Sequence, residues 1–175
     1  FARPYRIMSK TQTLVLDKKQ IAQKISRIAW QVYEDNFSEK EIILAGIDKT
    51  GFLLARRILT VLEKISPLKI KLVKIILDKE NPLTCNMEPK ISAAELKGKI
   101  VVLVDDVLNS GMTLTYSLCP FLDADVKKIR TVILVDRNHK RFPIGADFTG
   151  ISLATTLQER ITVDLDGQED SVVLS

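Results

Sequence analysis

Four short apolar runs separated by amphipathic segments constrain the fold of this chain more than any other feature. The runs are EIILAGI (41–47), KIKLVKIIL (69–77), KIVVLVDDV (99–107) and IRTVILVDR (129–137). The first run is too short for a helix and rich in isoleucine, which is typical of a strand buried on both faces of a parallel sheet. We expect strands at the other three runs as well. Apolar residues at helical spacing precede the first run and follow it, so we expect helices there.

The order of these elements predicts an α/β fold, because strands that alternate with helices form a central parallel sheet flanked by helices. The first helix should run from about Lys18 to Asp35, with Asp17 and Gln20 forming a capping box at its start. The helical pattern at 112–124 contains Pro120, which should disturb its course. The short pieces DFTGISLA, RITVDL and SVVLS predict a small β-rich lobe at about 138–175.

The length of 175 residues fits one domain with a real hydrophobic core. We expect this domain to occupy residues 8–175, with Met8 as a native start and residues 1–7 as a remnant or a disordered tail. The segment 78–99 contains two prolines and no long periodicity. We therefore expect most of it to be a loop of the functional or mobile kind.

The composition says more about the cellular compartment of the protein than about its chemical function. No apolar stretch reaches the roughly 18 to 20 residues that span a bilayer, so we expect no membrane segment. Cys85 and Cys119 match no metal or redox spacing, which makes a reduced, cytoplasmic setting the simplest inference. The net charge of +4 permits contact with phosphates or nucleic acid, although such a lysine surplus also fits a solvated surface.

Adjacent carboxylates, Asp105 and Asp106, stand where the third apolar run ends. Ligands of parallel sheets bind where loops leave the carboxyl ends of the strands, which selects the segments 48–51, 105–113 and 136–141. Carboxylates there can accept hydrogen bonds from vicinal hydroxyls or hold a divalent ion with waters. An unpaired charge in a buried strand is costly, so the pair predicts either a turn or a binding site.

The residues that follow, Asn109-Ser110-Gly111-Met112-Thr113, could receive a phosphate. Gly111 permits a tight turn in which backbone N–H groups converge on an anion, and the helix that follows adds its positive dipole end. Carboxylates for hydroxyls beside a cradle for a phosphate indicate a sugar phosphate. The same spacing also fits an ordinary polar turn that caps a helix, and the motif alone does not separate the two readings.

Here the chain resembles a known family. VVLVDDVLNSGMT resembles the phosphoribosyl diphosphate (PRPP) signature of type I phosphoribosyltransferases, and LDKKQIAQKISRIAWQVYEDN, IILAGIDKTGFLLARRI and VILVDRNHKRFPIGADFTG resemble PyrR proteins, bifunctional pyrimidine-operon attenuators and uracil phosphoribosyltransferases. The likeness covers nearly all of 14–173 except 78–99. It implies the type I phosphoribosyltransferase fold with a C-terminal hood over the base, and a homo-oligomer. It also implies Mg²⁺-dependent transfer from PRPP to a nucleobase, in the first place uracil, giving a nucleoside monophosphate.

The resemblance also implies roles for individual residues. Asp105 and Asp106 would bind the ribose hydroxyls and, with Asp166, a magnesium ion; Asp164 is an alternative to Asp166. Asn109 stands where purine enzymes carry an acidic candidate base. By the same resemblance, the 5′-phosphate would be bound by the loop Ser110, Gly111, Met112 and Thr113. The pyrophosphate loop would consist of Lys49, Thr50 and Gly51, and the base would be bound by Arg137 and Phe148. Lys49 could equally be a solvated lysine, and Phe148 a core residue.

Two further features leave the function open between enzyme and regulator. The family's RNA contact would fall on Ser26, Arg27, His139, Lys140 and Arg141, which together could also be a plain basic surface. The segment 78–99 takes the place of the family's flexible catalytic loop but lacks its Tyr-Arg-Asp-Asp-like run. The alternative to the enzyme is therefore an RNA-binding attenuation regulator that senses UMP or PRPP with weak or no turnover.

Overall fold

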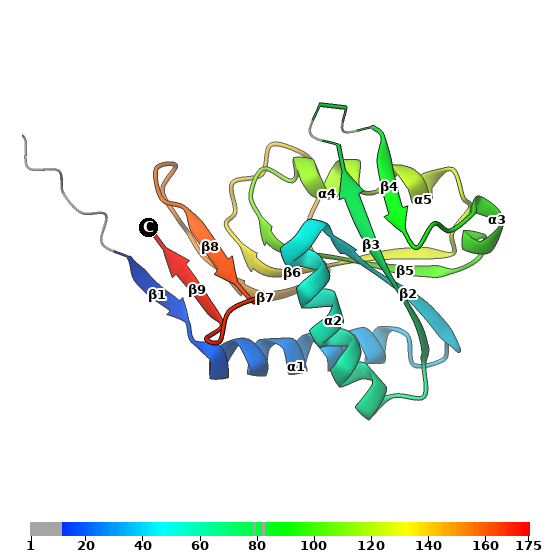
Figure 1. The fold of residues 1–175 in the computed structure, drawn as a ribbon, viewed down its shortest axis with the longest axis horizontal. Helices are drawn as coiled ribbons and strands as arrows, with labels where there is room; N and C mark the ends of the chain where they lie inside the picture. The colour runs from blue at the N-terminus through cyan, green and yellow to red at the C-terminus, as the bar shows by residue number, and fades with distance from the viewer. Residues whose placement is uncertain (1–11, 79, 82) are drawn as a thin grey trace, which may run out of the picture.

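The computed structural model describes residues 12–78, 80–81 and 83–175, and the expectations for 1–7 and Met8 lie outside this part of the chain. A six-stranded sheet with the order β4-β3-β2-β5-β6-β7 forms the centre (Figure 1). Its strands are β2 (Glu41–Ile47), β3 (Lys69–Leu77), β4 (Cys85–Glu88), β5 (Ile100–Leu108), β6 (Lys128–Asp136) and β7 (Phe148–Ser152). All neighbours are parallel except β4, which runs antiparallel to β3.

Helices cover both faces of this sheet, so its central strands are buried on both sides. In β2, Ile42 and Leu44 belong to one hydrophobic core, whereas Ile43 and Ala45 belong to a second core on the opposite face. The first core contains residues of α1 (Lys18–Asp35) and α2 (Asp48–Ile65), and the second contains residues of α3 (Ala93–Leu96), α4 (Met112–Tyr116) and α5 (Cys119–Leu122). The predicted α/β class is confirmed.

The predicted start of α1 is confirmed in detail. The Asp17 carboxylate accepts a hydrogen bond from the Gln20 backbone N–H at 2.8 Å, and the Gln20 side chain accepts one from the Asp17 N–H at 2.9 Å. The expected apolar stripe is buried against the sheet and consists of Ile21, Ile25, Ile28, Ala29 and Val32. Among the described residues, no helix combines the length and the apolar character that a membrane crossing requires.

The helical pattern after β5 is interrupted, as Pro120 predicted. α4 ends at Tyr116 and α5 begins at Cys119, with Pro120 in its first turn, where the missing N–H costs no intrahelical bond. At the break, the Ser117 hydroxyl donates to the Thr113 carbonyl at 2.8 Å. The pieces are short because proline cannot continue the hydrogen-bond ladder of the preceding turn.

The segment 78–99 contains more regular structure than we expected of a loop. β4 pairs with the end of β3, and Cys85 and Met87 pack against the second core while Asn86 and Glu88 are exposed. α3 follows, with a capping box formed by Ser92 and Glu95. An alternation over only four residues is too short to signal a strand in the sequence, which explains the difference.

A second, three-stranded sheet forms the lobe that we call the hood: β1 (Thr13–Leu16), β9 (Ser171–Leu174) and β8 (Ile161–Asp164), antiparallel in that order. Its composition differs from the lobe expected at 138–175, because β1 comes from the N-terminal part and β7 belongs to the central sheet. Gly150 allows β7 to lie against β6, since a Cβ there would come within 2.5 Å of the Leu134 carbonyl oxygen.

An arginine of α2, Arg57, binds the hood at two points. The Arg57 guanidinium donates to both carboxylate oxygens of Asp170, one of them at 2.7 Å, and to the Leu165 carbonyl at 2.8 Å. Asp170 is only 6% exposed, and its hydrogen bond raises the pKa of Arg57 above the usual value. A bidentate pair of this kind fixes orientation as well as distance.

We expect Arg57→Met to lower the free energy of unfolding by about 1–3 kcal/mol, because it leaves the buried Asp170 carboxylate unpaired; the partial exposure of Arg57 keeps the loss below that of a fully buried pair. Urea denaturation measures the loss, and hydrogen exchange should show faster opening of β8 and β9. The control is Arg56→Met, which removes the exposed neighbouring arginine. Equal effects of both variants would contradict the role of Arg57.

Candidate functional site

The three segments selected from the sequence lie at one edge of the central sheet. β2, β5 and β6 are parallel neighbours, so their carboxyl ends meet there, followed by 48–51, 109–113 and 137–141. The prediction that ligand-binding loops gather at this edge agrees with the strand order. We describe the edge residue by residue, beginning with the carboxylates.

Asp105 is a buried carboxylate at the end of β5. It is 8% exposed, and its Oδ1 accepts a hydrogen bond from the Asp106 backbone N–H at 2.9 Å. Burial, and then the neighbouring Asp106 charge, raise the pKa of Asp105 well above its ordinary value. Neither aspartate forms an ion pair with a described residue. The pair is therefore poised to accept hydroxyl hydrogen bonds or a cation.

The predicted loop 48–51 is instead the first turn of α2, which begins at Asp48. Asp48 has a φ of 49°, a left-handed conformation that turns the chain directly from β2 into the helix. Gly51 brings this turn against β5, since a Cβ there would lie 2.8 Å from the Val104 carbonyl and 3.2 Å from Asp105 Oδ1. The positive end of the α2 dipole thus faces the carboxylate edge, with Lys49 and Thr50 in the same turn.

The residues 109–113 form a turn between β5 and α4 that the segment after β6 holds in place. Gly111 has a φ of 83°, and a Cβ there would lie 2.7 Å from Ile144. The Ser110 carbonyl accepts hydrogen bonds from the backbone N–H groups of Arg141 at 2.8 Å and Phe142 at 3.1 Å. A cavity of about 240 Å³ opens here, lined by Asp105, Val107, Leu108, Asn109, Ser110, Gly111, Met112, Thr113 and Leu114.

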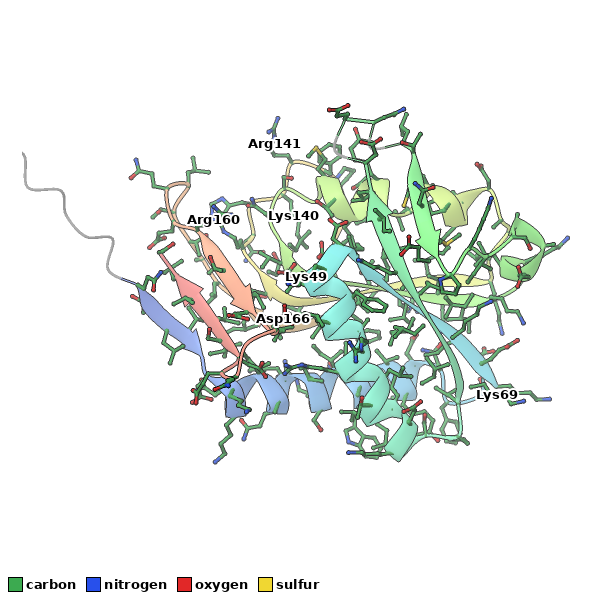
Figure 2. All side chains as sticks on the ribbon, in the orientation of Figure 1. Lys49, Lys69, Lys140, Arg141, Arg160 and Asp166 are labelled. Carbon is green, nitrogen blue, oxygen red and sulfur yellow. The ribbon has the colours of Figure 1, made fainter. Side chains whose placement is uncertain are left out.

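Lys49 and Asp166 form an ion pair between α2 and the hood, with Nζ and Oδ2 at 2.5 Å (Figure 2). The hydrogen bond between them raises the pKa of Lys49 and lowers that of Asp166. Asp164 accepts hydrogen bonds from the backbone of Asp166 and Gly167, so it shapes this turn. Within the described residues, no three side chains of the His, Cys, Asp or Glu type are gathered for a metal ion, and Asp166 does not join the aspartate pair of β5.

Arg137 acts as a buried clamp between the phosphate-loop candidate and the chain that leads to the hood. It is 8% exposed, and its guanidinium donates to the Asn109 side chain at 3.3 Å and to Thr155 Oγ1 at 3.0 Å. Two further donations reach the carbonyls of Thr156 at 3.2 Å and Glu159 at 2.6 Å. These contacts make Arg137 a positioning residue; nothing in the sequence around Thr155 or Glu159 signalled this link.

Phe148 is not brought to the site. It lies in β7 opposite Val132 of β6 and packs against the first core. Val132 comes four residues before Asp136, where β6 ends at the candidate site. In a strand, four residues span about 13 Å. The structure therefore favours the core alternative for Phe148, and its contact with a base stays a prediction.

The residues predicted to contact RNA have individual local partners. Arg27 donates to the carbonyls of Thr149 at 3.0 Å and Gly150 at 2.7 Å, at the edge of the sheet. His139 Nε2 lies 2.5 Å from the Thr155 carbonyl, and Lys140 pairs with Asp136 at 3.6 Å. Arg141 is exposed (Figure 2), and Ser26 is half-buried. A common role for these residues stays a prediction.

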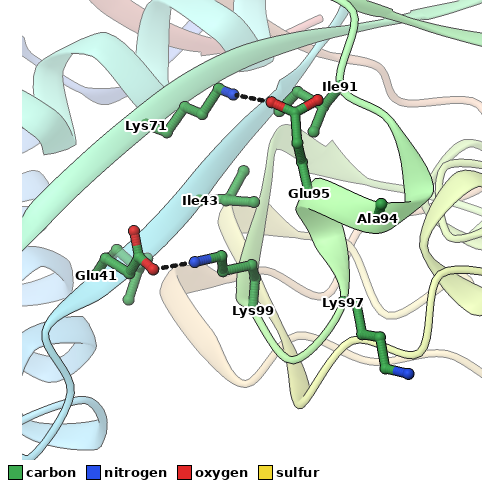
Figure 3. A pocket seen from close by; sticks show the side chains of 9 residues that line it. Glu41, Ile43, Lys71, Ile91, Ala94, Glu95, Lys97 and Lys99 are labelled. Atoms are coloured by element: carbon green, nitrogen blue, oxygen red, sulfur yellow. Dashed lines mark hydrogen bonds and ion pairs between the residues drawn. The ribbon is translucent and has the colours of Figure 1, made fainter.

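A larger cavity of about 450 Å³ lies at the opposite edge of the sheet, where β2 and β5 begin (Figure 3). Two ion pairs cross it: Lys99 with Glu41, and Lys71 with Glu95 at 3.5 Å. None of the residues selected from the sequence lines this cavity. Lys71 and Lys99 already have carboxylate partners and are not free to bind a charged ligand. We therefore prefer the smaller cavity beside Asp105 as the candidate site.

Comparison with known proteins finds similarity along most of the chain. Residues 11–165 match the family model described as the phosphoribosyl transferase domain. Bifunctional protein PyrR from Clostridioides difficile is 36% identical, with coverage of 91% of this chain and 96% of that protein. The PyrR proteins of Clostridium acetobutylicum and Bacillus subtilis are 35% and 33% identical, covering 90% and 93% of this chain and 94% and 96% of theirs.

Solved structures share the fold at lower sequence identity. The hypoxanthine phosphoribosyltransferase of Trypanosoma cruzi superposes with a TM-score of 0.74 at 17% identity, covering 92% of this chain and 95% of that one. A hypoxanthine-guanine phosphoribosyltransferase from Bacillus anthracis gives a TM-score of 0.67 at 20% identity, covering 80% and 81%. These similarities confirm the phosphoribosyltransferase fold.

We expect Asp105→Asn to stabilise the ligand-free protein at neutral pH. A raised pKa means that the folded state binds the Asp105 proton more tightly than the unfolded chain, so stability is lost as the pH rises above the ordinary value of 3.8. The variant's gain in free energy of unfolding should therefore be largest at about pH 7 and shrink toward about pH 3. Denaturation across this range measures it, with Asp123→Asn as an exposed control. A destabilised variant at neutral pH would contradict the assignment.

Proposed function

The chain belongs to the PyrR family of phosphoribosyltransferases, and on that premise we propose that it transfers the phosphoribosyl group of PRPP to uracil, giving UMP and diphosphate. The observation that carries the proposal is the buried, unpaired Asp105 beside Asp106 at the end of β5, next to the turn 109–113. Acceptors for vicinal hydroxyls adjoin a turn whose N–H groups suit a phosphate, which is the pattern that a ribose 5-phosphate requires.

Different residues of the site bind different parts of PRPP. Asp105 and Asp106 accept hydrogen bonds from the ribose hydroxyls, and the 109–113 turn receives the 5′-phosphate. The first turn of α2, with Lys49, faces the diphosphate. A uracil nitrogen forms the bond to C1 of the ribose while the bond from C1 to the diphosphate oxygen breaks. The diphosphate leaves with the electron pair, and the proton that the uracil nitrogen carried is released to solvent. The protein contributes positioning and stabilisation of developing charge.

We propose Mg²⁺ as the cofactor, and the donors at the end of β5 fit it. Magnesium is usually held by one or two carboxylates together with waters and substrate phosphates, rather than by a cage of protein ligands. Asp105 and Asp106 are adjacent and without ion-pair partners among the described residues. When bound, the ion would neutralise charge on the diphosphate. Asp166 could join only after it releases Lys49.

A regulatory, RNA-binding role is our second candidate, and one contact favours it. The backbone N–H groups of Arg141 and Phe142 both donate to Ser110, so the basic segment 139–141 is joined to the phosphate-loop candidate. A nucleotide bound at that turn would therefore influence the segment. Attenuation of this kind predicts RNA affinity that changes with UMP and weakens steeply with salt. No affinity at low salt, with and without UMP, would refute it.

The oligomeric state and the compartment belong to the same proposal. We propose a homo-oligomer, as the resemblance implies. We also retain the cytoplasmic setting, which Cys85 and Cys119 support because both are free thiols.

We expect the protein to form UMP from PRPP and uracil in the presence of Mg²⁺. The double variant Asp105→Asn/Asp106→Asn should lose at least about 100-fold in kcat/KM, because it removes the carboxylates that accept hydrogen bonds from the ribose. Assays with uracil, orotate, guanine, hypoxanthine and xanthine measure the product. UMP would also show that the altered segment 78–99 supports turnover. Unchanged activity in the double variant would refute the site, and a purine product would refute the proposed base.

The Lys49–Asp166 pair makes a separate prediction. Lys49→Met should raise the KM for PRPP by about tenfold, since a charge-assisted hydrogen bond to the diphosphate is lost. Asp166→Asn should lower that KM, by about two- to fivefold, because the exposed ion pair that competes for Lys49 is worth little. Steady-state kinetics at saturating uracil measure both. A raised KM in Asp166→Asn that extra Mg²⁺ reverses would instead assign Asp166 to the metal.

A further inference from the structure

The only two cysteines of the chain, Cys85 and Cys119, lie on elements that pack against each other. Cys85 begins β4 and packs against the second core, on the face of the sheet that α3, α4 and α5 cover. Cys119 begins α5, and residues of α5 approach residues of β4 to within 8 Å between Cα atoms (Figure 1). A disulfide joins Cα atoms up to about 7 Å apart, so the two elements stand at the separation that such a bond spans.

The two thiols are half-buried, and each lies within the electrostatic reach of the other. Burial, and then the charges of Cys119 and Asp48, raise the pKa of Cys85 to about 11. Cys85 is therefore almost entirely protonated at neutral pH, and a protonated thiol reacts poorly with oxidants because the thiolate is the nucleophile. An oxidant thus reacts first with Cys119, and Cys85 is the thiol that lies beside the oxidised sulfur.

Cys85 is connected to the start of α2 through the end of β3. In the antiparallel pairing of β3 and β4, Cys85 lies opposite Leu77, the last residue of β3. The Leu77 backbone N–H donates to Asp48 Oδ1 at 3.4 Å, and Asp48 is the first residue of α2. A displacement of β4 therefore reaches the turn 48–51, which faces the diphosphate in the proposed function.

From this arrangement we propose that Cys85 and Cys119 form a redox-active dithiol, which a peroxide converts to a disulfide that weakens PRPP binding. The effect on PRPP rests on the proposed function, whereas the formation of the disulfide does not. Bonded sulfurs lie about 2 Å apart and unbonded atoms in contact about 3.5–4 Å, so the bond draws β4 toward α5. The end of β3 and the Asp48 turn move with β4. Disulfides in a reducing compartment are usually transient and redox-sensing, as this one would be.

The oxidation takes place in two steps with hydrogen peroxide as the oxidant. The Cys119 sulfur attacks one peroxide oxygen and the O–O bond breaks, which gives a sulfenic acid; the other oxygen leaves with the thiol proton as water. The Cys85 sulfur then attacks the sulfenic sulfur, and the S–O bond breaks. The released hydroxide takes the Cys85 proton as a second water. The two sulfurs together lose two electrons, and the peroxide gains them.

Counting free thiols in the full chain before and after peroxide tests the dithiol without any turnover. Both thiols should disappear, the intact mass of the single chain should fall by two hydrogen atoms, and a non-reducing gel should show no cross-linked chains. Dithiothreitol should restore both thiols. Because it does not reduce methionine sulfoxide, it also separates the disulfide from oxidation of the exposed Met112.

Calorimetric titration with PRPP and Mg²⁺ measures the consequence. Oxidised wild type should bind PRPP about tenfold more weakly than reduced wild type, since a misplacement of about 1 Å at a site is costly. Hydrogen exchange of the 48–51 amides should change on oxidation without any ligand. Cys85→Ser and Cys119→Ser conserve side-chain size, and each should bind PRPP like the reduced wild type before and after peroxide.

Three results would overturn the proposal: two free thiols after treatment, a bond between chains or a sulfinic acid in place of the internal disulfide, and a disulfide that leaves PRPP affinity unchanged. A protein that makes no UMP, yet forms the disulfide and changes its exchange at 48–51, would refute the transferase and keep the dithiol.

Discussion

The burial of the Asp105 carboxylate at the end of β5 is the constraint on which the rest of the site depends. A carboxylate so close to the first turn of α2 has a strongly raised pKa and no described cation beside it. Such an arrangement costs stability in the free protein. It persists because β5 lies between β2 and β6 and is held by both. A buried group with a strongly shifted pKa that lowers the stability of the free protein is typical of a site arranged for a ligand.

Three cationic side chains that differ in burial link the hood to the rest of the protein, beside the apolar contacts that the hood makes with the first core. Arg57 holds the buried Asp170 in a bidentate pair, and Arg137 joins Asn109 to the chain before β8. Lys49 and Asp166, by contrast, form an exposed pair at the proposed diphosphate position. The two arginines therefore fix the hood, whereas the lysine contact is weak enough for a charged substrate to replace it.

Local patterns in the sequence predicted the strands β2, β3, β5 and β6, the α1 capping box and the position of the ligand-binding edge. Apolar runs and caps depend on neighbouring residues, and the edge follows from the general rule for parallel sheets. The Arg57–Asp170 pair joins residues 113 positions apart, and β1 joins the hood from the opposite end of the chain. No local signal encodes such contacts. The start of α2 was missed because Asp48 adopts a left-handed conformation without being glycine.

The two edges of the central sheet differ in whether their charged side chains form ion pairs. At the carboxyl edge of the sheet, Asp105 and Asp106 have no ion-pair partner among the described residues, whereas the cavity at the opposite edge is crossed by ion pairs of Lys71 and Lys99. The account places PRPP at the first edge alone. Hydrogen exchange with and without PRPP and Mg²⁺ tests this most directly. Protection confined to the amides of 48–51 and 105–113 is the predicted result. Protection around Glu41 and Lys99 instead, or none at either edge, would contradict it.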